Sequence, residues 1–360
     1  MAPTVMDPSS KERRPRAIVK LNGERVQAFD DVDVTLIAKA EADTFGITVA
    51  NDGGKYTGEF HERTDPEESG KVRPEVEIWM GSVADEDYGE ADLVKMMYGV
   101  VDEATFEFSR DGEAITLSGR DMTALLLDAR VAQRFPKRPA ASHVKDMVQA
   151  HGLTLDLKGA GGAMQAFVED DVTEWDVVEM MARKMKAVAF AIPGTKTIYV
   201  GPRQKKEMLP PVVFRVNAQC ITIKKNLTAK YEVEVRSWDD KKTSIVGKYP
   251  AKPEKGAQKR LYKLPEVRTI AEAKARAQAI YEELSRDGVE VEATIPFNPL
   301  YMPEHHVIAE YAGDPDPLGP LARAYYINEV THRISKHGGG TTEIKALLPV
   351  EEFRAEGKGS

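Results

Sequence analysis

One short stretch of the sequence, Glu304-His305-His306 with Glu310 just after it, carries residue types that could hold a metal ion. Neighbouring residues of a strand point to opposite faces, so the two histidines cannot join one site in an undistorted strand. We therefore expect exposed histidines at a loop-to-strand edge. His332 and His337 flank a four-residue segment and lack the further ligands that a tetrahedral zinc site needs. The histidines predict no metal site.

Acid–base and nucleophilic chemistry is also poorly supported. Carboxylate pairs such as Asp85/Asp87 and Asp170/Asp171 lie in polar segments, where solvated side chains are more common than a glycosidase pair. The glycines of segment 159–162 do not follow a strand and open a helix with Lys-Ser/Thr behind them, unlike a phosphate-binding loop. No serine stands in a nucleophile elbow. We expect no catalytic, cofactor-binding or metal-binding residue, and thus no enzyme and no cofactor.

Cys220 is the single cysteine of the chain. It excludes an intramolecular disulfide and a zinc site built from thiolates. It lies in the strand-like segment 218–223, where we expect a small core residue rather than a nucleophile.

A tryptophan beside charged residues, in Arg236-Ser237-Trp238-Asp239, could instead bind a protein. Tryptophan and arginine are enriched at the energetic centres of protein interfaces. Trp238 at the end of a strand is therefore either an anchor at the rim of a partner surface or a local plug of the core. The interface interpretation names Arg236 and Trp238, with Trp79 as a third candidate.

Composition describes a folded protein of several domains. The chain has 360 residues, 42% hydrophobic and 30% charged, with a net charge of −8. Net acidity disfavours nucleic-acid binding as the main task. No apolar run approaches the roughly 20 residues that a membrane crossing needs, so no membrane anchor is expected. Residues 1–16 lack the hydrophobic stretch of a signal peptide and predict a flexible arm on a protein made in the cytoplasm.

The segment Glu75 to Leu127 organises the first domain. Phe106 and Phe108 alternate with polar residues, as do Ile115 and Leu117, which is typical of strands with one wet face. Asp111-Gly112 predicts a tight hairpin, as does Asn22-Gly23. Asp121 can cap a helix over 122–127. Six or so short strands predict a closed or nearly closed first β-barrel over 17–128.

Composition changes after residue 128. Segment 130–139 reads as a linker, and a small α/β module over 129–206 follows. Ser142 is expected to cap a helix over 143–150, and Thr173 with Asp176 a second helix. A strand at 153–157 and a hairpin around Pro193-Gly194 complete the module.

The region 207–350 predicts a second β-barrel domain with one helix at about 269–287, capped by Thr269 and Glu272. Segment 241–263 is basic and punctuated by glycine and proline, so an exposed mobile loop is expected. Residues 351–360 predict a frayed tail. The fold class is therefore mainly β, with two barrels and an α/β insert.

Segments from three parts of the chain together resemble one family. Segments 76–81, 98–103 and 117–121 resemble the first barrel of phage tail baseplate hub proteins of the late-control gene D type. Segment 232–239 resembles the start of their second barrel, and segment 318–332 its closing strands.

The resemblance implies a structural hub in the virion baseplate of a phage or a related contractile injection machine. Two barrels per chain would assemble as a homotrimer, a pseudo-six-fold ring that joins the hexameric tail tube to the trimeric spike. The implied partners are the tail tube or distal tube protein, the central spike, the tape-measure protein and baseplate wedge proteins. Phage DNA would pass through without specific binding. A tail-associated cell-wall hydrolase and a host-binding tail protein remain as alternatives.

Overall fold

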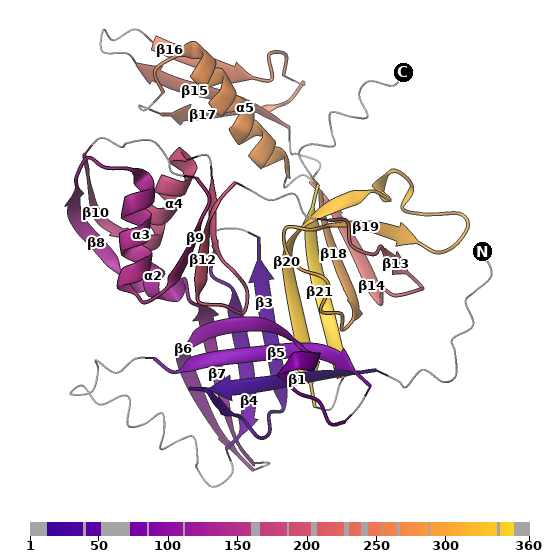
Figure 1. The fold of residues 1–360 in the computed structure, drawn as a ribbon. Coiled ribbons are helices and arrows are strands. Elements are labelled where there is room, and N and C mark those ends of the chain that lie inside the picture. Colours follow the sequence, from indigo (N-terminus) through magenta and orange to yellow (C-terminus); the bar gives the residue numbers. More distant parts are fainter. Residues whose placement is uncertain are drawn as a thin grey trace. The chain divides into compact units, whose positions relative to one another are not determined.

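A computed structural model describes residues 13–38, 41–51, 73–84, 86–110, 112–159, 166–185, 187–202, 207–226, 230–238, 244–253, 255–264, 267–286, 289–336 and 339–348. The chain divides into two compact units. The first unit comprises Met1–Glu207, Ile295–Glu304 and Asn328–Glu343, and the second Met208–Thr294, His305–Ile327 and Ile344–Ser360. The fold is mainly β with a few short helices, as the sequence predicted (Figure 1).

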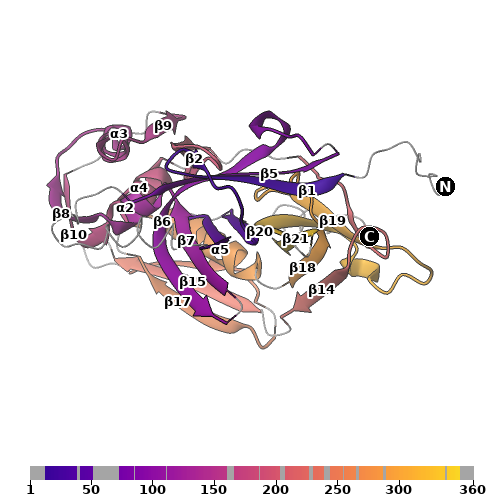
Figure 2. The same cartoon turned by 90° about the horizontal axis from the view of Figure 1, so that it is seen from below.

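An antiparallel sheet forms the body of the first unit, in the strand order β21-β20-β3-β4-β7-β6-β5-β1-β2. Figure 2 shows β1 and β5 running side by side. The strands are β1 Arg14–Leu21, β2 Glu24–Arg25, β3 Asp31–Ile37, β4 Thr44–Ala50, β5 Glu75–Val83, β6 Val94–Ser109, β7 Gly112–Asp121, β20 Ala324–Ser335 and β21 Gly339–Leu347. The last two strands run from one unit into the other.

Alternation along these strands builds one core. In β3 the residues Val32, Val34 and Leu36 are fully buried, and the residues between them are half-buried. Their buried counterparts on the other strands form a single hydrophobic cluster that includes Phe297 from the segment before β19. The alternation predicted at Ile115 and Leu117 is confirmed, because both are buried between less buried neighbours, whereas Phe108 of β6 is 65% exposed.

The first sheet differs from the predicted closed barrel. Among the strand ladders that the structure describes, none joins β1 back to β21. Pro15 of β1 packs close to Gly340 of β21, where a Cβ on the glycine would lie 2.8 Å from the proline Cβ. Proline has no backbone N–H, so Pro15 cannot donate to a ladder at this point.

The predicted turn at Asn22-Gly23 closes its hairpin. Asn22 and Gly23 have φ values of 51° and 84°, the left-handed pair that a two-residue hairpin turn requires. Ser109 pairs with Gly112 at the end of the β6–β7 ladder, while Asp111 lies outside the described residues. The predicted arm over 1–16 is also shorter than expected, because β1 already begins at Arg14.

An α/β module completes the first unit. Figure 1 shows its helices α3 and α4 between the β8–β10 ladder and the sheet of β9, β12 and β11. Its elements are α2 Ala124–Asp128, β8 Arg130–Phe135, α3 Ala140–Ala150, β9 Thr154–Leu157, β10 Phe167–Thr173, α4 Glu174–Lys184, β11 Val188–Ala191 and β12 Thr197–Gly201. Trp175 and Met181 lie in its core.

Three predictions for this module need correction and one is confirmed. The expected linker over 130–139 contains strand β8, because Val131 and Phe135 bury themselves in the module core. Helix α3 begins at Ala140 behind Pro139, since proline suits the start of a helix, and not behind Ser142. Asp121 accepts hydrogen bonds from Thr123 instead of capping α2 directly. Thr173 and Asp176 do form the predicted capping box.

The second unit contains two sheets. Strand β18 (Val289–Pro296) pairs with β14 (Cys220–Lys225), and β19 (His306–Tyr311) pairs with β20 and with β13 (Val212–Phe214). Cys220 is exposed, contrary to the core position expected, because β14 is the edge strand and its residues lie mostly at the surface. Short 3-10 turns occur at Glu90–Asp92 in the first unit and Gly319–Leu321 in the second.

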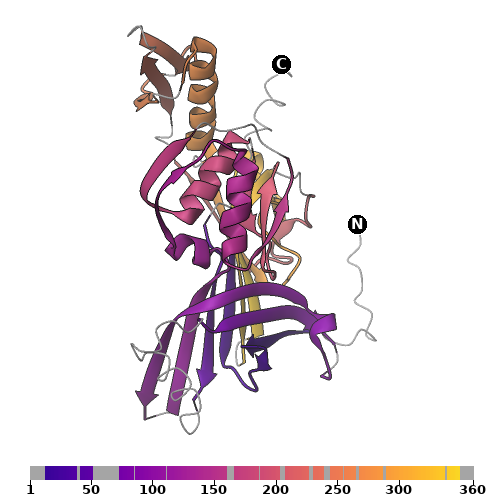
Figure 3. The same ribbon diagram turned by 60° about the vertical axis from the view of Figure 1, so that its left-hand side comes forward.

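A separate module of the second unit comprises β15 (Tyr231–Trp238), β16 (Ser244–Tyr249), β17 (Gln258–Lys263) and α5 (Ile270–Arg286). Its sheet has the order β16-β15-β17, so β15 does not enter the larger sheet. Figure 3 shows α5 on one side of this sheet. The expected loop over 241–263 thus holds two strands, because Ile245, Tyr249 and Tyr262 pack beneath α5. The Thr269–Glu272 capping box is present, as predicted, and Ile270 in the first turn of α5 is exposed.

Candidate functional site

The histidines and acids first considered for metal or acid–base chemistry do not converge. His306 begins β19, and its ring packs edge-on against Tyr326 with centroids 5.8 Å apart. No cluster of three or more His, Cys, Asp or Glu side chains with metal-binding geometry occurs within the described part of the chain. Asp85 and His337 lie outside the described residues.

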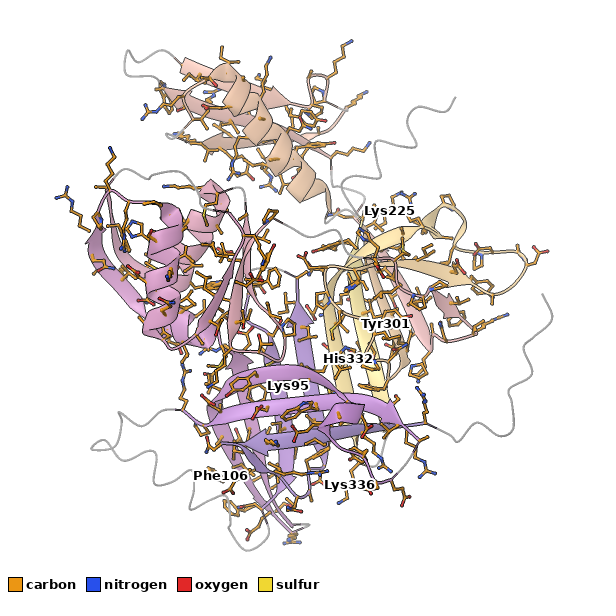
Figure 4. All side chains as sticks on the ribbon, in the orientation of Figure 1. Lys95, Phe106, Lys225, Tyr301, His332 and Lys336 are labelled. Carbon is orange, nitrogen blue, oxygen red and sulfur yellow. The ribbon has the colours of Figure 1, made fainter. Side chains whose placement is uncertain are left out.

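His332 is a structural core residue. Its Nε2 donates to the carbonyl oxygen of Tyr301, 3.0 Å away, and its Nδ1 accepts from the hydroxyl of Thr342 at 3.0 Å (Figure 4). A carbonyl cannot donate, so this pair of partners assigns the proton of the neutral ring to Nε2. Burial lowers the pKa of His332 to about 4. The neutral imidazole ties β20 and β21 to the segment around Tyr301.

A buried pair of carboxyl groups, Asp43 and Asp121, was not anticipated from the sequence. The Asp121 side chain accepts from the backbone N–H of Asp43 at 3.1 Å and of Thr123 at 2.8 Å. Asp43 Oδ1 accepts from the Ile37 N–H at 2.7 Å. Burial raises the pKa of Asp121 to about 6, and burial together with the neighbouring Asp121 charge raises the pKa of Asp43. Both groups satisfy backbone donors, so their arrangement holds strand ends together.

Trp79 is covered by cations. Its side chain is 7% exposed and packs in a small cluster with Ile18 and Leu93. The ammonium groups of Lys20 and Lys95 lie 5.1 and 4.8 Å from its ring centre. These contacts are cation–π interactions that stabilise the β1–β5–β6 surface. A ring so enclosed offers little area to a partner.

Arg236 and Trp238 lie on one face of β15, as residues two apart in a strand must. Trp238 ends the strand with 46% of its surface exposed, so it is not the core plug that was the alternative interpretation. Arg236 Nε lies 2.5 Å from Glu234 Oε1 on the same face. The two predicted candidates therefore share one surface with a third, unforeseen residue.

Glu234 is the centre of that surface. Its side chain is only 1% exposed, and it forms ion pairs with Arg236, with Lys259 at 2.7 Å and with Lys248 at 3.4 Å. The hydrogen bond from Lys259 is the largest cause that lowers the pKa of Glu234 to about 2. The cluster was not predicted from the sequence, because Lys248 and Lys259 both lie in the segment expected to be a loop. The alternation of Val233 and Val235 with Glu234 and Arg236 was an available signal, since it places the two charged residues on one face of a strand.

Among the described helices, none combines the length and the apolar character that a membrane crossing requires.

Comparison with known proteins relates this fold to phage tails. No family model and no curated protein matches the sequence. The solved structure of the 43 kDa tail protein of prophage MuSo2 from Shewanella oneidensis is similar to this chain, with a TM-score of 0.73 and 13% identity over 93% of this chain and 99% of that one. The tail protein from Neisseria meningitidis MC58 gives a TM-score of 0.68 and 15% identity over 93% and 96% of the two chains.

An Escherichia coli component of the type VI secretion system, itself structurally similar to bacteriophage T4 tail proteins gp27 and gp5, gives a TM-score of 0.55. Its identity to this chain is 11%, over 92% of this chain and 77% of that one. Likeness at such low identity is a likeness of fold. Almost the whole chain therefore has the fold of phage tail proteins, which confirms at the level of the fold the resemblance that its sequence motifs indicated.

Proposed function

We propose that this protein is a structural hub of a phage tail baseplate or of a related contractile injection machine. The observation that carries the proposal is the fold, which matches tail proteins from two bacteria over 93% of this chain. The type VI secretion component shares it as well. A connector that works through shape alone would keep its architecture while its sequence diverges.

The buried ionisable groups support a role without catalysis. His332 is held neutral between two hydrogen-bond partners, and Asp121 is held by backbone and hydroxyl donors. Each of these shifted pKa values has a structural cause in the packing around the group. The hub would therefore act by assembly.

In the proposed assembly three chains form a ring of six similar β domains. The sheets would satisfy their edge strands by pairing across subunits, which explains why the first sheet does not close on itself within one chain. The ring would join the six-fold tail tube or distal tube protein to the three-fold spike. The tape-measure and wedge proteins would bind the same virion hub.

One face of the first sheet has the character expected of a channel wall. Away from the core, β3, β4, β6, β7 and the part of β20 in the first unit present small, hydroxylated and acidic residues. Thr35 bonds to Thr331 at 2.9 Å and Thr48 to Thr116 at 3.3 Å across this face. Its charged residues by the strand register are Asp31, Asp33, Arg120, Glu103, Glu107, Glu329 and Arg333, five acids against two arginines. An acidic wall would let DNA pass without sticking.

The mass of the purified protein tests the ring. Analytical ultracentrifugation at micromolar concentration is expected to show a trimer. A monomer that stays monomeric when co-expressed with the tube and spike proteins of its own phage would contradict the proposal. A peptidoglycan zymogram should show no clearing. Clearing that one carboxylate substitution abolishes would establish the hydrolase alternative instead.

A further inference from the structure

The β15–β17 module has one face that the proposed ring leaves unexplained. Helix α5 covers the other face so closely that Gly247 of β16 touches the helix backbone. The strand register then places alternate residues of all three strands on the open face. These residues are Glu232, Glu234, Arg236 and Trp238 of β15, Ser244, Val246 and Lys248 of β16, and Lys259, Leu261 and Lys263 of β17.

We infer that this open face binds an acidic segment of a partner protein that also carries apolar side chains. The inference goes beyond the hub function, because the ring requires no ligand on this module. Two properties of the face, its charge and its exposed apolar groups, carry it.

Charge is the first property. The face holds four cationic side chains against two carboxylates, on a chain whose net charge is −8. A local positive surface on an acidic protein attracts a negative partner over roughly a Debye length, about 8 Å at physiological salt. The complementary ligand is therefore acidic.

The cations are also held in place. Glu234 stays ionised and forms ion pairs with the head groups of Arg236, Lys248 and Lys259, whose own side chains remain 43%, 50% and 50% exposed. Side chains fixed before binding lose less entropy when they meet a ligand. Each retains N–H donors beyond the one that Glu234 accepts. The buried carboxylate thus positions three donors toward solvent.

Exposed apolar groups are the second property. Trp238 is 46% exposed and Leu261 47% exposed, and Val246 lies beside Arg236 in the register. Large apolar side chains next to arginine are typical of the energetic centre of an interface. Their ligand should carry its own apolar side chains among its carboxylates.

A nucleic acid fits this face less well. Affinity for phosphates grows with the number of cations that meet them, and two of the four positive charges are offset by Glu232 and Glu234. The remaining chain would repel a long polyanion more than a short acidic peptide. A protein segment is the ligand that the face favours.

The experiment uses the full chain and a short fluorescent peptide in which glutamate alternates with leucine and phenylalanine. We expect saturable binding at low salt that weakens as salt is added. Trp79 and Trp175 are buried, so a shift of intrinsic fluorescence on binding reports Trp238. The variant Lys248→Glu/Lys259→Glu should weaken binding at least about tenfold.

Because those two lysines neutralise Glu234, a second variant, Leu261→Ser/Lys263→Glu, tests the face without touching the ion-pair cluster. It should also weaken binding about tenfold. The matched control is Lys274→Glu, an exposed lysine of α5 on the covered side of the same module, which should bind like the wild type.

Three results would overturn the inference. The first is no binding, or equal affinity in both face variants and the wild type. The second is tighter binding of single-stranded oligothymidylate than of the peptide, which would assign the face to nucleic acid. The third is self-association that both face variants abolish and the peptide does not displace, which would assign the face to a second copy. A trimer that fails to bind the peptide would refute this inference alone and would leave the proposed hub function unaffected.

Discussion

Gly247 of β16 lies directly against Ala273 of α5: a Cβ placed on the glycine would stand 2.2 Å from the alanine carbonyl carbon. We predict that Gly247→Ala destabilises the β15–β17 module, because backbone cannot move aside as a flexible side chain can. Overpacking of this kind costs about 1–3 kcal/mol. Urea unfolding followed by circular dichroism measures the change.

Gly89→Ala is the matched control. A Cβ at residue 89 would meet nothing closer than 3.9 Å, and its φ of −121° suits any residue. Its unfolding midpoint should stay close to that of the wild type. An equal loss of stability in both variants would show that α5 does not approach β16 as described.

His332 predicts a loss of stability in acid. Its pKa is about 4 in the folded protein and near 6.5 when unfolded, so the unfolded chain binds the additional proton between these values. Stability should therefore fall as pH drops from 6.5 toward 4, by up to about 3 kcal/mol from this group. His332→Asn should cost about 1–3 kcal/mol at neutral pH and lose this part of the pH dependence.

His306→Asn provides the comparison, since this half-buried ring packs edge-on against Tyr326 in β20. His306→Asn should therefore show the same change in stability between neutral and acid pH as the wild type. If His332→Asn kept the same slope as the wild type, His332 would not be the buried neutral group described above.

The Asp43–Asp121 pair predicts a pH dependence of stability opposite to that of His332. Both carboxyl pKa values are raised by folding, so the folded state binds more protons and loses stability as pH rises through about 6. Asp43→Asn keeps an oxygen for the Ile37 N–H and removes one charge. We expect the variant to gain stability over the wild type by about 1 kcal/mol more at about pH 8 than at about pH 5.

Thermal unfolding at the two pH values measures this difference, with the exposed Asp87→Asn as control. An advantage of Asp43→Asn that shrinks with rising pH would contradict the pairing.

Trp238 predicts a charge preference in fluorescence quenching. It is 46% exposed beside Arg236, whereas Trp175 and Trp79 are 2% and 7% exposed. Iodide should quench the protein better than caesium, because the basic face concentrates anions near the indole ring. Trp238→Phe should remove most of the quenching, while Trp79→Phe should leave it. Stronger quenching by caesium would refute a basic surface around Trp238.

Local patterns in the sequence were sufficient for much of the fold. Alternation found the strands around Phe106 and Ile115, and the left-handed turn at Asn22-Gly23 was evident from residue types that tolerate positive φ. These features depend on neighbours in the chain. They are the features that physical reasoning from sequence reaches most directly.

Long-range pairing was beyond such patterns. Asp43 and Asp121 meet across 78 residues, and neither position stands out among the many acids of the chain. Strand β17 was not predicted, because Gln258–Lys263 is mostly polar and exposed. This segment forms a strand through its ladder with β15, which local sequence patterns do not show. The Glu234 cluster depends on that ladder and was hidden with it.

The pairing of β3 with β20 also sets the order in which the protein can mature. Thr35 meets Thr331 across 296 residues, so a nascent chain leaves the ribosome with the edge of β3 uncovered until β20 has been synthesised. A prematurely released polypeptide would expose that edge to neighbouring chains. A complete β3–β20 ladder therefore forms only after translation has passed Ser335.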